Sequence, residues 1–217
     1  QITVETSKQD DGVHITARND SPRRTRSWVK LTVTVPPGSP TRLRTRGGSV
    51  KVEGTGAEVS AHTAGGSIKT VGTSGAVELE TAGGSIRVDD HGGPVRAATM
   101  GGSIRLAGHL LGVDSTTIGG SIRVDGAYGP VAASTKGGSI HVVGRLTGSS
   151  SLDTAGGAIK VELAADTNIQ VQVHGDSISS NVEGDKRHGG ADYTIGTGDE
   201  GKLVARAIAG SVSIRRA

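Results

Sequence analysis

Seven basic side chains recur at one position of a repeated motif, where they could bind a negatively charged polymer. Each follows a Gly-Gly-Ser or Gly-Gly-Ala triplet and one Val or Ile, and successive members are 18 residues apart, with one final step of 19. A regular file of cations can attract teichoic acid, lipopolysaccharide, an acidic polysaccharide or nucleic acid. The members of this set, called the basic column, are Lys51, Lys69, Arg87, Arg105, Arg123, His141 and Lys160.

Acidic residues two positions further on give the same column a second interpretation. They occur in alternate copies of the motif and are expected to face the same way as the cations. The alternative is therefore a solvated surface with local ion pairs, which requires no ligand. Nucleic acid is the least expected polyanion, because one Trp, two Tyr and no Phe cannot supply a series of aromatic stacking platforms. The acidic set is Glu53, Asp89, Asp125 and Glu162.

The sequence predicts no catalytic site, no metal site and no cofactor. It has no cysteine, which removes thiolate nucleophiles and thiolate metal ligands. His91 and His109 are expected in one slot of successive copies, but zinc usually takes three or four protein ligands and that slot offers no third. Gly-Gly-x-Gly-x-Asp calcium repeats and a Gly-x-Ser-x-Gly nucleophile motif are absent. A polysaccharide-cleaving β-helix is kept as the least favoured function, because its site needs convergent carboxylates.

The elements that must position the basic column are two short strands in each 18-residue unit. Each unit begins with Thr-x-Gly-Gly, and residues 83–88 are echoed nine positions later by residues 92–97. Alternation puts Ile86 and Val88 on one face of a strand and Arg87 on the other. The pattern predicts an all-β fold, a single-stranded parallel β-helix (β-solenoid) that is right-handed, with about 18 residues per turn and turns about 4.8 Å apart. The repeated threonines are Thr45, Thr63, Thr81, Thr99, Thr117, Thr135 and Thr154.

The threonines and the Gly-Gly pairs are interpreted as structural. A file of Thr hydroxyls could bind ice or carbohydrate, but ice binding would need a flat double column and the neighbouring slot varies in residue type. Alternation from Val59 and Ala61 puts Thr63 inward or at the rim, where its hydroxyl can bond backbone groups of the turn. The glycines are expected at turns that require a positive φ.

The whole chain, residues 1–217, is predicted to be a single β-solenoid domain with capping strands at both ends. Residues 1–44 are expected to form N-terminal strands over 2–4, 13–15 and 29–35 that cover the open sheet edge and hold Trp28. Residues 45–163 are the regular repeats. Residues 164–217 are predicted as degenerate C-terminal turns, with a polar loop over 183–201 and a last turn over 203–214.

Three segments carry a family resemblance: residues 33–38 (VTVPPG), the repeated Thr-x-Gly-Gly-Ser-Ile, and residues 208–214 (IAGSVSI) preceded by a Gly-Thr-Gly at 196–198. In these segments the sequence resembles a bacterial family of glycine-rich, adhesin-like domains of unknown function, over nearly the whole chain. The resemblance implies a β-helix associated with the cell envelope, at or outside the membrane. It implies no catalytic residue.

The leading functional prediction is a non-enzymatic structural module, adhesin-like, that is secreted or displayed on the cell surface. A net charge of +3 and a pI near 9.4 favour an anionic partner weakly, and the expected one is an anionic cell-surface polysaccharide bound by the basic column. No run of 18 apolar residues predicts a transmembrane segment, and an export signal or anchor is expected outside this sequence. The alternative is a filament subunit that self-associates end to end.

Overall fold

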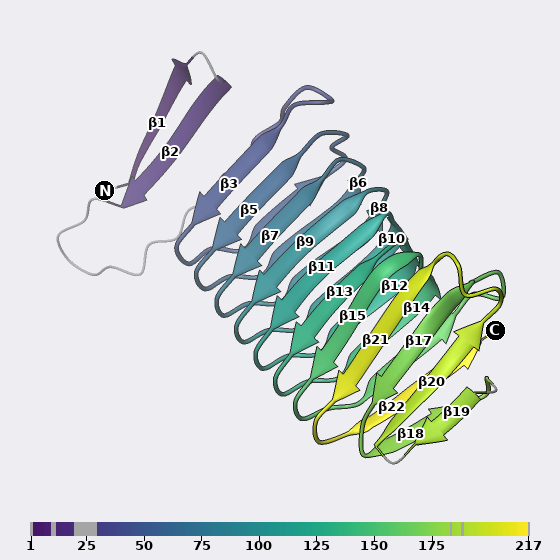
Figure 1. Cartoon of the computed structure of the whole chain (residues 1–217). Coiled ribbons are helices and arrows are strands. Elements are labelled where there is room, and N and C mark those ends of the chain that lie inside the picture. The colour runs from purple at the N-terminus through teal and green to yellow at the C-terminus, as the bar shows by residue number, and fades with distance from the viewer. Residues whose placement is uncertain (1, 10–11, 20–29, 183, 188, 217) are drawn as a thin grey trace. The chain divides into compact units, whose positions relative to one another are not determined.

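The computed structural model describes residues 2–9, 12–19, 30–182, 184–187 and 189–216, and these residues contain strands and turns but no helix (Figure 1). They belong to two compact units, residues 1–36 and residues 37–217. The first unit contains an antiparallel hairpin of β1 (Ile2–Gln9) and β2 (Gly12–Asn19), which confirms the strands predicted at 2–4 and 13–15. The described part of the chain has no apolar helix that could cross a membrane.

The strand predicted at residues 29–35 is wrong over residues 30–35, which lie outside every strand. Leu31, Val33 and Val35 alternate with polar residues as in a strand, but each is at least 40% exposed. Alternation alone is insufficient, because a strand also needs a neighbour that accepts and donates its backbone hydrogen bonds. Trp28 lies outside the described residues, and the capping role of residues 1–44 stays a prediction.

Residues 37–217 form a β-solenoid of about seven regular turns, each of which contributes one strand to each of two sheets. The turns follow one another along the stack in Figure 1. The nine-stranded sheet takes from them β4 (Val50–Glu53), β6 (Ile68–Thr73), β8 (Ile86–His91), β10 (Ile104–Leu110), β12 (Ile122–Tyr128), β14 (Ile140–Arg145) and β16 (Ile159–Leu163). The eleven-stranded sheet takes β3 (Thr41–Thr45), β5 (Val59–Thr63), β7 (Val77–Thr81), β9 (Pro94–Thr99), β11 (Gly112–Thr117), β13 (Val131–Thr135) and β15 (Gly148–Thr154).

Equivalent residues of successive turns pair directly, so their side chains stack in files. Ile104 of β10 pairs with Ile86 of β8 on one side and with Ile122 of β12 on the other. All three isoleucines are 1% exposed. One turn cannot bury its own inward face, so most of this stabilisation comes from contacts between neighbouring turns. The predicted all-β solenoid with about 18 residues per turn is confirmed, while its right-handed sense stays a prediction.

Each repeated threonine from the second turn onward joins two turns at the Gly-Gly corner. Thr99 Oγ1 donates a hydrogen bond to the carbonyl oxygen of Gly84 in the preceding turn, at 2.8 Å. The same oxygen accepts a bond from the amide of Gly102 in its own turn, at 3.3 Å. The structural interpretation of the Thr column is confirmed. The same two bonds are made by Thr63, Thr81, Thr117, Thr135 and Thr154.

Close stacking, and not a positive φ, is what requires glycine at the second position of the Gly-Gly pairs from the second pair onward. Neither Gly101 nor Gly102 has a positive φ, so the expected reason for these glycines is wrong. A Cβ on Gly102 would lie 2.1 Å from the carbonyl oxygen of Gly84, whereas one on Gly101 would meet its nearest atom at 3.6 Å. Left-handed backbone occurs at other positions, among them the C-terminal ends of β6 and β8. Gly72 there has φ 63°, and the non-glycine residue Asp90 has φ 53°.

The last segment of the chain is inserted between two turns that precede it in sequence. In Figure 1 the yellow strand β21 (Gly201–Ala207) lies between β15 and β17 (Ile169–His174). In the other sheet β22 (Ser211–Arg216) lies between β16 and β18 (Ser177–Ser180). The turn predicted over 203–214 therefore forms, but it is not the last turn of the stack.

The polar loop predicted over residues 183–201 is wrong where two strands form. These are β19 (Gly184–Arg187) and β20 (Gly190–Ile195), which pair with each other in antiparallel orientation. β20 also pairs with β17, so the two strands close one end of the eleven-stranded sheet. Glycine-rich, polar composition masked the alternation of Ala191, Tyr193 and Ile195, whose side chains are buried.

Candidate functional site

The basic column stands in one file on the outer face of the nine-stranded sheet, as predicted. Arg105 pairs in register with Arg87 on one side and with Arg123 on the other. Register pairs extend the file to Lys51 at one end and to Lys160 at the other. Neighbouring cations are separated by one strand spacing, about 4.8 Å, and they repel one another unless other groups compensate their charge.

Carboxylates in alternate turns provide this compensation, and three of them, Asp89, Asp125 and Glu162, each serve two turns. Asp89 Oδ2 lies 2.6 Å from Arg87 Nε in its own turn and 3.7 Å from Lys69 Nζ in the preceding turn. Asp89 is therefore shared by a near cation and a more distant one. Asp125 is shared in the same way by Arg123 and Arg105, and Glu162 by Lys160 and His141. Glu53 pairs with Lys51 of its own turn.

The carboxylates in the middle of the file lie beneath the cations that they serve. The side chain of Asp89 is 23% exposed, whereas those of Arg87 and Lys69 are 52% and 46% exposed. Asp125 is recessed in the same way beneath Arg105 and Arg123. A ligand that approaches this face therefore meets the cationic groups before it meets the carboxylates.

The ion pairs fix both the charge and the orientation of the groups. The hydrogen bond from Arg87, followed by the charges of Arg87, Lys69 and Arg105, lowers the pKa of Asp89 despite partial burial, so this carboxylate is ionised at neutral pH. A hydrogen bond from Lys160 likewise lowers the pKa of Glu162. Arg87 uses Nε for Asp89, and this bond leaves the terminal guanidinium nitrogens as donors toward an external anion.

A file of serines borders the basic column and is occupied in holding the turns together. Ser85 Oγ accepts a hydrogen bond from the amide of Ser103 in the next turn at 3.3 Å. Ser67 Oγ accepts the equivalent bond from Ser85 at 3.2 Å. These hydroxyls therefore link each turn to the next along the edge of the basic column.

The shared slot predicted for His91 and His109 is wrong. His91 is 2% exposed, whereas His109 is exposed and its ring centroid lies 4.7 Å from that of Tyr128. The register of β10 shifts so that Gly108 pairs with His91. This irregularity turns His109 outward and places Leu110 in the interior.

The environment of His91 suits a neutral imidazole. Its Nδ1 lies 2.8 Å from Thr73 Oγ1, and its Nε2 is buried without a hydrogen-bond partner. Burial lowers the pKa of His91 more than nearby backbone groups raise it. Among the residues that the structure describes, no group of three or more His, Cys, Asp and Glu side chains could hold a metal ion.

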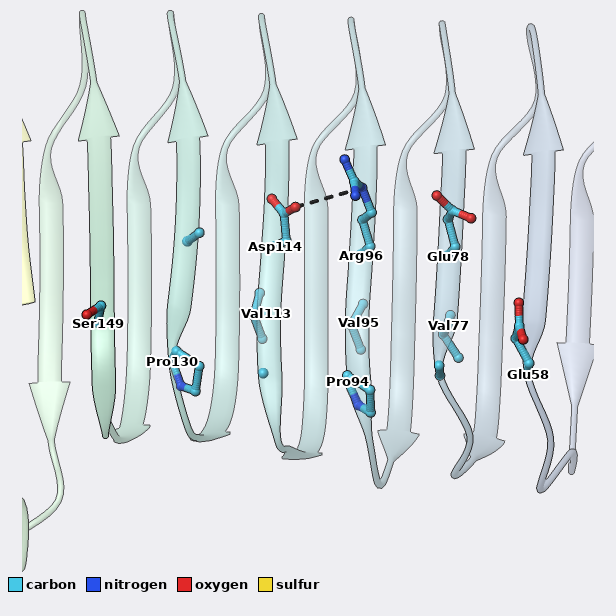
Figure 2. Close-up of a pocket in the computed structure, with 13 residues that line it drawn as sticks. Glu58, Val77, Glu78, Pro94, Val95, Arg96, Val113, Asp114, Pro130 and Ser149 are labelled. Carbon is cyan, nitrogen blue, oxygen red and sulfur yellow. Dashed lines mark ion pairs between the residues drawn. The ribbon is translucent and has the colours of Figure 1, made fainter. Parts of the chain in front are cut away.

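A shallow groove of about 580 Å³ crosses the outer face of the other sheet, and it was not among the sites predicted from the sequence. Figure 2 shows its lining side chains arranged across neighbouring strands. Its ionisable lining residues are Glu58, Glu78, Arg96 and Asp114, and the last two pair at 3.7 Å. The groove is thus mainly acidic, in contrast to the basic column on the other sheet. Small residues that recur at strand starts, including Pro94, Gly112 and Pro130, were the available sequence signal.

The comparisons with known proteins leave the family open. No family model, no curated protein and no solved structure matches the chain. The adhesin-like resemblance read from the sequence therefore stays a prediction.

Proposed function

We propose that this chain is a non-enzymatic, adhesin-like structural module of the bacterial cell surface that binds anionic polysaccharides through the basic column. The layering of charge carries the proposal: Arg87 and Lys69 are more exposed than the Asp89 that they share. An approaching polyanion would meet ammonium and guanidinium groups first. The cell-surface location rests on the family resemblance alone, and protease treatment of intact cells tests it.

The geometry of the column suits an elongated ligand. The cations run along the stack, one per turn, so a linear polymer lying across the strands could contact several of them at once. Many weak contacts on one polymer add up to useful affinity because each further contact is intramolecular. The turn-to-turn hydrogen bonds hold the face rigid before binding, which reduces the entropy lost on association.

Alternate cations are the better candidates for direct contact. Lys69 and Arg105 lie 3.7 and 3.9 Å from their carboxylates, whereas Arg87 lies at 2.6 Å. The longer ion pairs give up less energy when the cation turns to an external anion. Lys69 and Arg105 are two turns apart, or about 9.6 Å at the usual strand spacing. A polymer whose anionic groups repeat near this distance is therefore the expected ligand.

Affinity for a polyanion resin tests the proposal. The double variant Lys69→Ser/Arg105→Ser is compared with Arg42→Ser/Arg44→Ser, which removes the same charge from exposed positions on the other sheet. We expect the unaltered protein to bind teichoic acid or heparin resin at low salt and to elute as salt rises. The column variant should elute at clearly lower salt, and the control variant should elute with the unaltered protein.

Two results would count against polysaccharide binding. Failure of the unaltered protein to bind either resin at low salt would remove the proposal. If both double variants eluted at equally reduced salt, the effect would be one of net charge, and the basic column would have no specific role.

A second candidate function, end-to-end assembly into a filament, is favoured by the ends of the stack. Leu43 and Val50 in the first turn are only partly buried, and so are Ile178 and Val182 in the last. β4 and β18 are the terminal strands of the nine-stranded sheet, and edge strands can pair with another chain. Electron microscopy at high protein concentration tests assembly. Ile178→Lys should abolish filaments and Ile208→Lys, at a position that is 77% exposed, should not; monomers alone in the unaltered protein would exclude this function.

A further inference from the structure

The C-terminal segment of the chain, residues 201–216, occupies a slot between two turns that are already formed by earlier residues. β21 pairs with β15 on one side and with β17 on the other. β22 pairs with β16 on one side and with β18 on the other. Without this segment, four strands would each expose an unpaired edge in the interior of the stack.

The slot matches the segment as closely as one regular turn matches the next. Leu203, Val212 and Ile214 have no exposed surface and belong to the continuous core. A Cβ on Gly201 would lie 2.1 Å from the carbonyl oxygen of Gly148, and one on Gly210 would lie 2.1 Å from that of Gly157. Only an extended chain with glycine at these two corners fits. The slot therefore selects an extended peptide with glycine at these two corners and apolar residues at the buried positions.

The connection to this segment is short and has the composition of a hinge. Residues 196–200 join β20 to β21, and both Gly196 and Gly198 have left-handed backbone, at φ 64° and 73°. The hinge is held by Arg145, whose Nη2 lies 2.7 Å from each carboxylate oxygen of Glu200, and by Asn168, whose Oδ1 accepts a hydrogen bond from the Thr197 amide at 3.3 Å. A rotation within residues 196–199 would carry the segment away without altering any strand.

We propose that the slot accepts residues 201–216 of a second copy of this chain, so that two copies exchange their C-terminal segments. The exchanged segment would make the same backbone and core contacts as the original, so the exchange itself costs little free energy. Reciprocal exchange fills both slots and yields a closed dimer. Residues 201–216 are also synthesised after the four strands that border the slot, so the slot stays unfilled in each copy until these residues have been made.

Disulfide trapping tests the exchange, and the chain has no native cysteine to interfere. Ser151 of β15 and Val204 of β21 are register partners, so the variant Ser151→Cys/Val204→Cys can form one disulfide. The protein is unfolded, refolded at several concentrations, oxidised and analysed on a non-reducing gel. Covalent dimers should increase with protein concentration during refolding. Deletion of residues 197–199 in the same variant should convert most of the protein to dimer, because the shortened hinge cannot reach its own slot.

A matched pair separates exchange from nonspecific crosslinking. Ala132 and Ser151 are also register partners, but their strands β13 and β15 follow one another in sequence. Ala132→Cys/Ser151→Cys should give monomers at every concentration. If the first variant does not fold, Lys160→Cys/Ser213→Cys probes the same slot from the other sheet. Monomers alone in the slot variants, including those with the shortened hinge, would overturn the proposal, and so would equal dimer formation by the matched pair.

Discussion

Gly102 is stacked against Gly84 so closely that a Cβ on Gly102 would lie 2.1 Å from the carbonyl oxygen of Gly84. The preceding residue, Gly101, has its nearest atom at 3.6 Å, an ordinary contact distance. Neither residue has a positive φ, so the difference between them is purely one of space.

The Gly102→Ala substitution should therefore destabilise the solenoid by about 3 kcal/mol, because the backbone of two turns must move apart. The Gly101→Ala substitution should change the free energy of unfolding by no more than about 0.5 kcal/mol. Urea unfolding of both variants measures the contrast. Similar losses in the two would contradict the close-stacking explanation.

Thr99→Val should destabilise the protein by about 2 kcal/mol, because the carbonyl of Gly84 and the amide of Gly102 both lose their hydroxyl partner in a buried corner. Valine keeps the shape of threonine, so little packing is lost. Thr116→Val is the control, since Thr116 is exposed on β11 and should tolerate the change. Thermal unfolding compares them, and faster hydrogen exchange at the Gly102 amide in Thr99→Val alone would identify the broken bond.

Asp90→Gly should stabilise the solenoid slightly, by about 0.5 kcal/mol. Asp90 has φ 53° at a position where the preceding turn has Gly72 at 63°. Left-handed backbone costs an L-residue about 1–2 kcal/mol, less for aspartate, and the greater entropy of glycine in the unfolded chain offsets part of the gain. Asp90→Val should be clearly destabilising, since a β-branched residue tolerates this conformation least. A higher free energy of unfolding for Asp90→Val than for Asp90→Gly would refute the argument.

The stability of the protein should fall in mild acid partly because of His91. Burial lowers the pKa of His91 in the folded state, so the unfolded chain takes up this proton first as the pH falls below about 6.5. The free energy of unfolding should be insensitive to this residue above that pH and decrease below it. His91→Thr, which copies Thr73 in the preceding turn, should reduce the dependence between pH 7.5 and 5. His109→Gln, at an exposed position, should retain it.

The regular turns could be predicted because each repeats one pattern of side chains. Equal spacing of Ile86 and Ile104 implies that they stack, and the same spacing implies the file of cations. The sharing of Asp89 by Arg87 and Lys69 could also be foreseen in outline, because the acidic residues recur in alternate units. Residues that recur every 18 positions in the sequence pair in register in successive turns, so both the fold and the candidate site could be predicted.

The remaining features depend on interactions that no local pattern records. Strand alternation predicts that β21 forms a strand, but it does not predict which sheet edge β21 pairs with. The insertion of β21 between β15 and β17 is therefore not recorded in the local pattern. The outward turn of His109 follows from a single irregularity at Gly108, which interrupts the 18-residue register. Residues 30–35 show the converse, since strand-like alternation there has no strand beside it.

The sharing of one carboxylate between adjacent turns divides the solenoid into blocks of two turns. Deleting residues 83–100 would remove Asp89 and leave Lys69 next to Arg105, so that three successive cations would depend on Asp125. Deleting two turns would reproduce the original order of charges. Duplications or deletions of whole turns in the gene should therefore be tolerated in even numbers, so that the length of the solenoid changes by two turns at a time.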